Sequence, residues 1–95
     1  MASLIWAPSA LKDIEAIAEY ISRDSPANAS LFIDRIIEQT ERLAEFPMSG
    51  RVIPEIGQES AREIIYGNYR IMYSIRADEI WITGVIHGAR DCKKE

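Results

Sequence analysis

Apolar residues recur at two different periods in this chain of 95 residues, and the change of period constrains the fold more than any other feature. Up to about residue 46 they recur every three or four positions, which is typical of amphipathic helices. From about residue 51 they recur every second position, which is typical of strands. Because a chain of this length can bury one core and not two, we expect a single α+β domain over residues 1–95.

Two helices and an N-terminal strand are predicted in the first half. Residues 4–6 are β-branched, aromatic or leucine and indicate a strand. The first helix covers roughly residues 9–23 and follows Pro8, whose missing N–H costs nothing in the first turn of a helix. The second begins where Ser25 can cap and the following proline can open a helix, and it runs to about residue 46. The connection is short, so we expect an antiparallel helical hairpin.

The second half is predicted to form a small sheet. A short edge strand over residues 51–54 is followed by strands over residues 61–66, 69–76 and 79–87. Gly67-Asn68 is a two-residue turn pair between the second and third of these strands. We expect three or four strands in a mainly antiparallel meander, with the helical hairpin covering one of its faces.

The two-residue turn fixes the register of the hairpin that it closes. Counting from Gly67-Asn68 places Arg62 opposite Tyr73 on one face of the sheet. It places Arg70 opposite Ile65 on the other face, so the two arginines need not belong to one site.

The alternative is that each arginine closes a surface ion pair worth at most about 1 kcal/mol. The candidate acidic partners are Glu55, Glu59 and Glu63.

Two segments present more apolar surface than one helix–sheet contact requires. Strict alternation in the last strand sets Ile80, Ile82, Gly84 and Ile86 against Trp81, Thr83, Val85 and His87. The second helix has an apolar band widened by Ile33 and Ile37. Apolar area on two sides of a small domain indicates a surface covered by a partner, and the alternative is an ordinary core.

The segment His87-Gly88-Ala89-Arg90 ends the last predicted strand. Histidine titrates near neutrality and could act as a general acid. Ribonuclease chemistry would also need a base and cations, and Glu63 as the base with Arg62 and Arg90 as the clamp would supply them. The alternative is a strand-end histidine that donates to a carbonyl group.

The net charge argues against direct binding of nucleic acid. Eleven basic against fifteen acidic residues give a net charge of −4, the wrong sign for a protein that binds phosphate backbones. Residues 1–49 hold four basic and eight acidic residues, whereas residues 50–95 hold seven of each, so a local arginine cluster is still open. We therefore expect no direct nucleic-acid binding by the chain alone.

The cysteine content bears on which cofactors the chain could bind, and the hydropathy bears on where in the cell it is located. One cysteine, Cys92, and one histidine cannot form an internal disulfide or a zinc site, and we expect no metal or other cofactor. No apolar run approaches the length of a membrane span, and the N-terminus has no secretion signal pattern. We expect a cytoplasmic location and no contact with a membrane.

Five motifs are spaced along nearly the whole chain: Trp6-Ala7-Pro8-Ser9-Ala10-Leu11-Lys12-Asp13-Ile14, Pro47-Met48-Ser49-Gly50-Arg51, Arg62-Glu63, Tyr69-Arg70-Ile71-Met72-Tyr73 and Val85-Ile86-His87-Gly88-Ala89-Arg90. In this order and at these spacings they resemble the toxins of the RelE/ParE superfamily, the small proteins of bacterial toxin–antitoxin pairs. The resemblance implies a helical hairpin on one face of a small, mainly antiparallel sheet.

The superfamily contains two activities, and the residues bear on which applies. RelE-like members cut messenger RNA in the ribosome and are basic, with a tyrosine near the C-terminus. This chain departs from them in its charge, in lacking lysine between Lys12 and Lys93, and in lacking tyrosine after Tyr73. Other RNA-cleaving relatives place a tyrosine where this chain has Gly88.

The His-Gly-x-Arg ending instead resembles the ParE-type branch, whose members poison DNA gyrase by protein–protein contact without being enzymes. The resemblance thus favours a gyrase inhibitor neutralised by a cognate antitoxin. The alternatives are a ribosome-dependent mRNA endonuclease and a non-toxic interaction module.

The resemblance also implies a partner and site residues. It implies a hetero-oligomer in which the C-terminal segment of the antitoxin wraps the helical hairpin and adds to a sheet edge. The functional positions carried over from the motifs are Arg62, Arg70, Tyr73, His87 and Arg90. The candidate antitoxin contacts are the large apolar residues Trp6, Ile33, Ile37 and Trp81.

Overall fold

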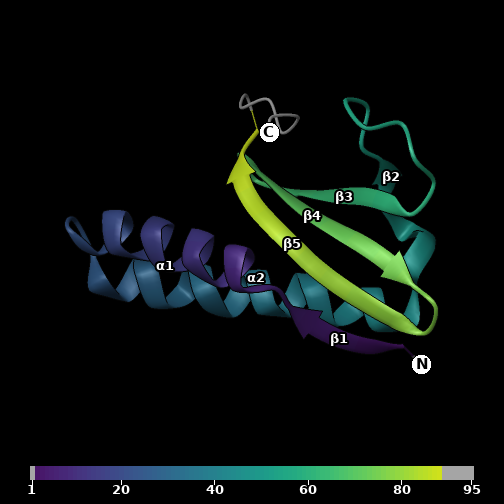
Figure 1. The fold of residues 1–95 in the computed structure, drawn as a ribbon. Coiled ribbons are helices and arrows are strands. Elements are labelled where there is room, and N and C mark those ends of the chain that lie inside the picture. Colours follow the sequence, from purple (N-terminus) through teal and green to yellow (C-terminus); the bar gives the residue numbers. More distant parts are fainter. Residues whose placement is uncertain (1, 89–95) are drawn as a thin grey trace.

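Two helices cover one face of a five-stranded sheet in the computed structural model, which describes residues 2–88 (Figure 1). The elements in chain order are β1 (Ser3–Trp6), α1 (Pro8–Ser22), α2 (Pro26–Glu45), the single-turn 3₁₀ helix η1 (Pro47–Ser49), β2 (Arg51–Val52), β3 (Ala61–Tyr66), β4 (Tyr69–Arg76) and β5 (Glu79–His87). This architecture confirms the predicted α+β class with its N-terminal strand, helical hairpin and mainly antiparallel sheet.

Local sequence signals explain where the helices begin and end. Pro8 occupies the first turn of α1, and Ala7 before it is extended, as a residue before proline prefers. The Ser25 hydroxyl accepts the N–H of Asn28 at 3.1 Å and caps α2, as predicted. Both helices end within about a residue of the predicted positions.

The strand order across the sheet is β1-β5-β4-β3-β2. The pairs β2–β3, β3–β4 and β4–β5 are antiparallel, whereas β1 pairs with β5 in parallel. The predicted register of the central hairpin is confirmed, because Arg62 lies opposite Tyr73 and Ile65 opposite Arg70. The sequence did not indicate where β1 joins the sheet, and β2 is two residues shorter than predicted.

The strict alternation predicted for β5 is wrong because a β-bulge interrupts it. Met72 lies opposite Gly84, but Tyr73 lies opposite Ile82, so Thr83 is an extra residue in the ladder. Beyond this point the faces are exchanged, and Val85 is buried in the core with Ile82. The apolar area of β5 is therefore less two-sided than the sequence indicated.

Side chains from α1 satisfy the backbone groups at this bulge. The Ser9 hydroxyl donates to the carbonyl oxygen of Thr83 at 2.8 Å, and the Asp13 carboxylate accepts the N–H of Val85 at 2.9 Å. Buried backbone groups that have left a ladder need such partners, so α1 fixes the position of the bulge.

One apolar cluster fills the space between the helices and the sheet. Its buried members are Ala10, Ile14, Phe32, Ile36, Leu43, Ile71, Tyr73, Ile80, Ile82 and Val85. Both helices, β4 and β5 contribute to it, so this core fixes how the two layers lie against each other.

Candidate functional site

A buried ion-pair network lies on the sheet face that points away from the helices. Arg70 Nε donates to Glu63 Oε1 at 2.6 Å, and the Arg70 guanidinium pairs with Glu55 at 2.8 Å. Arg51 reaches the other carboxylate oxygen of Glu63 at 2.7 Å. The bond to Glu55 is the main cause that raises the pKa of Arg70, and Glu63 adds to it against the effect of burial.

A second cluster lies on the helix-facing side, and we call it the Arg62–Tyr73 clamp. The Tyr73 hydroxyl donates to the Pro47 carbonyl oxygen at 2.6 Å and accepts the Gly50 N–H at 3.0 Å. Arg62 donates to the Gly50 carbonyl oxygen at 2.8 Å and to both the backbone and the carboxylate of Glu59. Burial raises the pKa of the Tyr73 hydroxyl, which is therefore a neutral donor at physiological pH.

The contacts in these two clusters can be compared with the alternative stated from the sequence, that each arginine closes a surface ion pair. The arginines do pair with Glu55, Glu59 and Glu63. Both arginines are buried, since Arg62 is 8% exposed and Arg70 is 5% exposed. The pairs of Arg70 with Glu55 and Glu63 are therefore largely buried, whereas the Arg62–Glu59 pair reaches the surface, because the Glu59 side chain is 84% exposed. Neither guanidinium is presented to a large ligand.

The four residues predicted for RNA cleavage are not brought together within residues 2–88. His87 lies opposite Tyr69 and shares its face of the sheet, whereas Glu63 lies on the other face. Arg62 is held in the clamp, and Arg90 lies outside the described residues. The described residues thus contain no pairing of His87 with the predicted base.

His87 instead lines a groove of about 350 Å³ between α1 and the end of β5, which we call groove 2. Its ring meets that of Tyr69 edge-on, with the ring centroids 5.9 Å apart. Asp13 also lines groove 2, but its carboxylate holds the bulge at Val85. No arginine among the described residues lines this groove.

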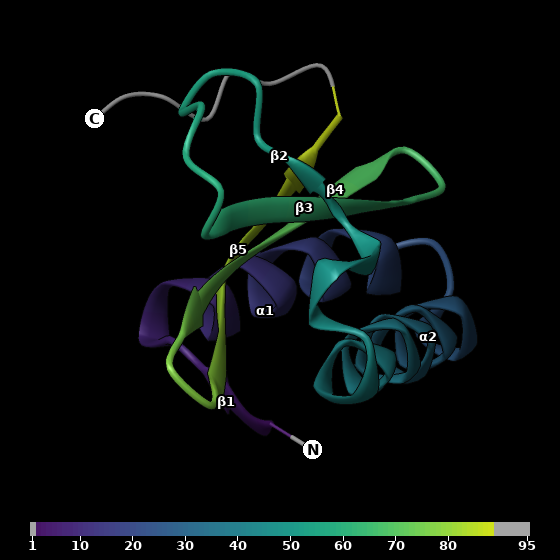
Figure 2. The same cartoon turned by 90° about the vertical axis from the view of Figure 1, so that its right-hand side faces the viewer.

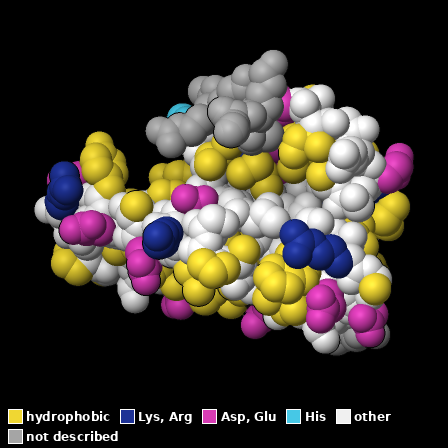
Figure 3. All heavy atoms as spheres, viewed as in Figure 1, with side chains coloured by type: hydrophobic (Ala, Val, Ile, Leu, Met, Phe, Trp, Pro, Cys, Tyr) yellow, Lys and Arg dark blue, Asp and Glu magenta, His cyan; other side chains and the backbone are white. Residues whose placement is uncertain are grey.

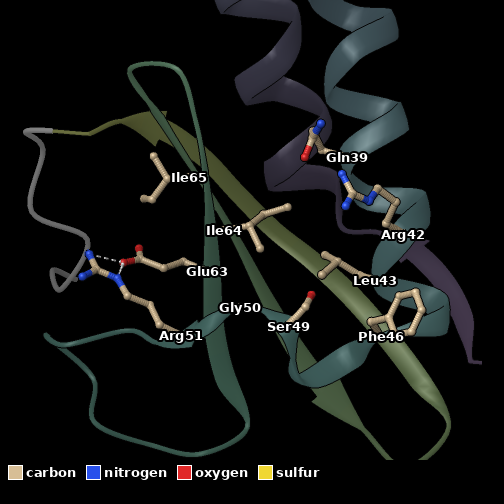
Figure 4. A pocket seen from close by; sticks show the side chains of 10 residues that line it. All are labelled: Gln39, Arg42, Leu43, Phe46, Ser49, Gly50, Arg51, Glu63, Ile64 and Ile65. Atoms are coloured by element: carbon tan, nitrogen blue, oxygen red, sulfur yellow. Dashed lines mark hydrogen bonds and ion pairs between the residues drawn. The ribbon is translucent and has the colours of Figure 1, made fainter.

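A larger groove of about 610 Å³, which we call groove 1, lies between α2 and the outer edge of β3 (Figure 4). Leu43 and Ile64 form its apolar floor between the two elements, and Phe46 forms a wall at the end of α2. Arg42 adds a positive charge and forms no ion pair within residues 2–88. The remaining lining residues are Gln39, Ser49, Gly50, Arg51, Glu63 and Ile65.

An unpaired strand edge borders groove 1. β2 pairs only with Arg62 and Glu63, so the outer side of β3 beyond Glu63 has no neighbouring strand among the described residues. The sequence patterns did not indicate this groove. The one signal is Phe46, a large aromatic residue at the end of the second helix, which is 61% exposed in the structure.

The residues predicted to contact a partner lie elsewhere. Trp6 and Ile33 are half-buried and pack against the core, while Ile37 is 38% exposed. Trp81 lies on the outer sheet face, with its indole N–H bonded to Glu79 and the Arg76 guanidinium 4.7 Å above its ring. None of the four lines groove 1 or groove 2, and their role in binding stays a prediction.

The face of the molecule shown in Figure 3 has no basic patch among the residues that the structure describes. On the face shown in Figure 3, basic side chains lie apart from one another, with acidic and apolar side chains between them. Within residues 2–88, no group of three or more His, Cys, Asp or Glu side chains is arranged to hold a metal ion. No helix in the same range has the length and hydropathy needed to cross a bilayer.

Comparison with known proteins identifies the family. A model described as the ParE toxin of type II toxin–antitoxin systems, parDE, matches residues 4–92. This chain belongs to the ParE toxin family. Toxin RelE2 of Caulobacter vibrioides is 31% identical to this toxin over 90 residues, which span 95% of this chain and 99% of that relative.

Solved structures share the fold of this toxin. The chromosomal ParDE system from P. aeruginosa contains a chain with a TM-score of 0.75 and 23% identity, covering 92% of this toxin and 96% of that chain. The toxin–antitoxin complex RelBE2 from Mycobacterium tuberculosis contains one with a TM-score of 0.62 and 16% identity, covering 90% and 96%. Relatives with ParE-type and RelE-type names thus have the same architecture, so the target must be argued from the site.

Proposed function

We propose that this toxin inhibits DNA gyrase by protein–protein contact, without catalysing a reaction, and that a cognate antitoxin neutralises it. One observation carries the proposal: the motif arginines of the sheet, Arg62 and Arg70, are buried, and their guanidinium groups are engaged by other groups of the chain. A nuclease must place cations against the developing charge on a phosphate. In the described part of this chain, those two cations face carboxylates and backbone carbonyl groups instead.

The position of His87 also supports a role in contact. General acid catalysis needs a partner base on the other side of the scissile phosphate, but Glu63 lies on the opposite face of the sheet. His87 is exposed at the end of β5, where it can touch a protein surface.

We propose groove 1 as the binding site for the antitoxin. Its apolar floor suits the alternate side chains of an extended peptide, and the neighbouring β3 edge offers main-chain groups to such a peptide. Arg42 favours an acidic side chain at one position of that peptide. The antitoxin segment that we propose is therefore extended, with alternating apolar residues and at least one carboxylate.

The test compares two assays on one preparation of purified toxin. We expect inhibition of plasmid supercoiling by gyrase, while messenger RNA on translating ribosomes stays intact. The His87→Ala variant should inhibit gyrase with at most a modest loss, because a contact residue is one of many. Two results together would establish a ribonuclease instead: supercoiling that continues in the presence of the toxin, and cleavage of messenger RNA. In that case the cleavage activity should fall by about 10²-fold or more in the His87→Ala variant.

A further inference from the structure

The segment between α2 and β2 does not pair with the edge of β3, although β2 directly after it does. Arg51 lies opposite Glu63 and Val52 opposite Arg62, so the same antiparallel register would place Ser49 opposite Ile65. Instead η1 descends from β2 toward α2, as Figure 2 shows. The edge of β3 at Ile65 is left without a strand among the described residues.

The Arg62–Tyr73 clamp accounts for this departure. Both backbone polar groups of Gly50 are bound by the clamp, the N–H by the Tyr73 hydroxyl and the carbonyl oxygen by Arg62. Both side chains reach Gly50 from the helix-facing side of the sheet. They therefore hold the chain before Arg51 beneath the sheet and away from β3.

Glycine is required where the clamp closes. A Cβ atom on residue 50 would lie 2.5 Å from the Glu63 carbonyl oxygen and 2.6 Å from the Tyr73 hydroxyl. Gly50 has an ordinary extended backbone, so the requirement comes from this close approach and not from its φ angle. The Tyr73 hydroxyl also binds the Pro47 carbonyl oxygen, which fixes the other end of η1.

The edge that stays open has main-chain groups that point outward. Every second residue of an edge strand directs its N–H and C=O away from its one neighbour. Ala61 does so, since its carbonyl oxygen accepts the N–H of Ile53 at 2.9 Å, and Glu63 follows two residues later opposite Arg51. By the same period Ile65 directs its groups into the space beside groove 1, which it helps to line.

We infer that Arg62 and Tyr73 are positioning residues for antitoxin binding: they hold η1 away from the edge of β3 and keep Ile65 open to an incoming strand. This inference rests on the proposed docking of the antitoxin in groove 1. Neither residue lines groove 1, so their effect on binding is indirect. They act through the backbone of Pro47 and Gly50, which they bind, and so they fix η1 with Ser49 and Gly50 along the side of groove 1.

The test uses Tyr73→Phe and, as a matched control, Tyr69→Phe. Both variants lose one hydroxyl on the helix-facing side of β4, but no hydrogen bond within residues 2–88 engages the Tyr69 hydroxyl. The probe is the purified product of the open reading frame next to this gene. Its dissociation constant is measured with each variant, and hydrogen–deuterium exchange is followed in the free and bound toxin.

We expect the wild-type complex to protect the Ile65 amide, and Tyr73→Phe to bind roughly tenfold more weakly, as the loss of two hydrogen bonds at one hydroxyl implies. In free Tyr73→Phe the Gly50 amide should exchange faster while core amides such as that of Ile82 do not change, which global destabilisation would not produce. Tyr69→Phe should bind like the wild type. If Tyr73→Phe does not fold, Arg62→Lys serves in its place, since lysine keeps the charge but not the forked geometry.

Two outcomes would overturn the inference. Wild-type affinity in Tyr73→Phe, with faster exchange at Gly50, would show that the clamp does not control binding although the antitoxin docks there. A complex that leaves Ile65 unprotected would remove the incoming strand itself. Neither outcome depends on the gyrase assay, so the proposed target stands or fails separately.

Discussion

Ala77 is the only non-glycine residue with a positive φ angle in the described part of the chain. It lies in the turn between β4 and β5 with a φ of 54°. An alanine in this left-handed region brings its Cβ close to the next carbonyl oxygen, at a cost of roughly 1–2 kcal/mol. The sequence marked Gly67-Asn68 clearly as a turn, whereas this second turn carries no glycine to mark it.

We predict that Ala77→Gly raises the free energy of unfolding by about 0.5–1 kcal/mol. The free energy gained by relieving the backbone strain exceeds the free-energy cost of the greater conformational entropy that glycine gives to the unfolded chain. Ala16→Gly is the matched control, because Ala16 is exposed within α1. There the same change should lower the free energy of unfolding by about 1 kcal/mol.

Urea denaturation of the two variants beside the wild type measures both effects. Equal destabilisation by Ala77→Gly and Ala16→Gly would show that residue 77 is not strained.

Individual faces of the sheet could be predicted because register follows from turn length and side chains alternate. That reasoning placed Arg62 and Arg70 on opposite faces, as observed. It could not predict their burial. Ile53 and Glu55 belong to a segment without hydrophobic period, and only its folded path shows that it meets the outer face of the sheet.

At the scale of elements, the buried network ties the segment before β3 to the sheet. Glu63 is central, since its two carboxylate oxygens bind Arg70 and Arg51. Removing one partner of a buried ion pair leaves an uncompensated charge, which costs more than the pair itself is worth.

We predict that Glu63→Gln lowers the free energy of unfolding by about 3 kcal/mol. Glu59→Gln is the matched control, because the Glu59 side chain also pairs with an arginine but is 84% exposed. Its loss should cost less than about 1 kcal/mol. Chemical denaturation followed by circular dichroism distinguishes the two, and comparable losses would contradict the burial argument.

The bulge in β5 marks the limit of prediction at this scale. Alternation alone assumes one residue per step of the ladder, and an inserted residue such as Thr83 leaves no sign in the pattern of apolar residues. The bulge is stabilised by Ser9 and Asp13, which are about seventy residues away in the chain. Sequence spacing within β5 therefore could not indicate it.

The whole molecule is a helical layer on a sheet, and this arrangement follows from the two periods in the sequence. Groove 1 does not follow from them. It exists because η1 leaves the edge of β3, and that path depends on a tyrosine and an arginine that meet Gly50 in three dimensions. The positions of residues within elements could be predicted, whereas the space between elements could not.

For the whole molecule, we propose that the toxin acts by docking onto other proteins and does not bind a polyanion. It has a net charge of −4, and the motif arginines of its sheet are internal. A protein that binds phosphates through several cations shows an affinity that falls steeply with salt concentration.

Fluorescence anisotropy of labelled single-stranded RNA, titrated with purified toxin at about 50 mM salt, tests this claim most directly. We predict no saturable binding of RNA, while the same preparation binds gyrase. Tight, salt-dependent binding of RNA without binding of gyrase would contradict the proposed mode of action.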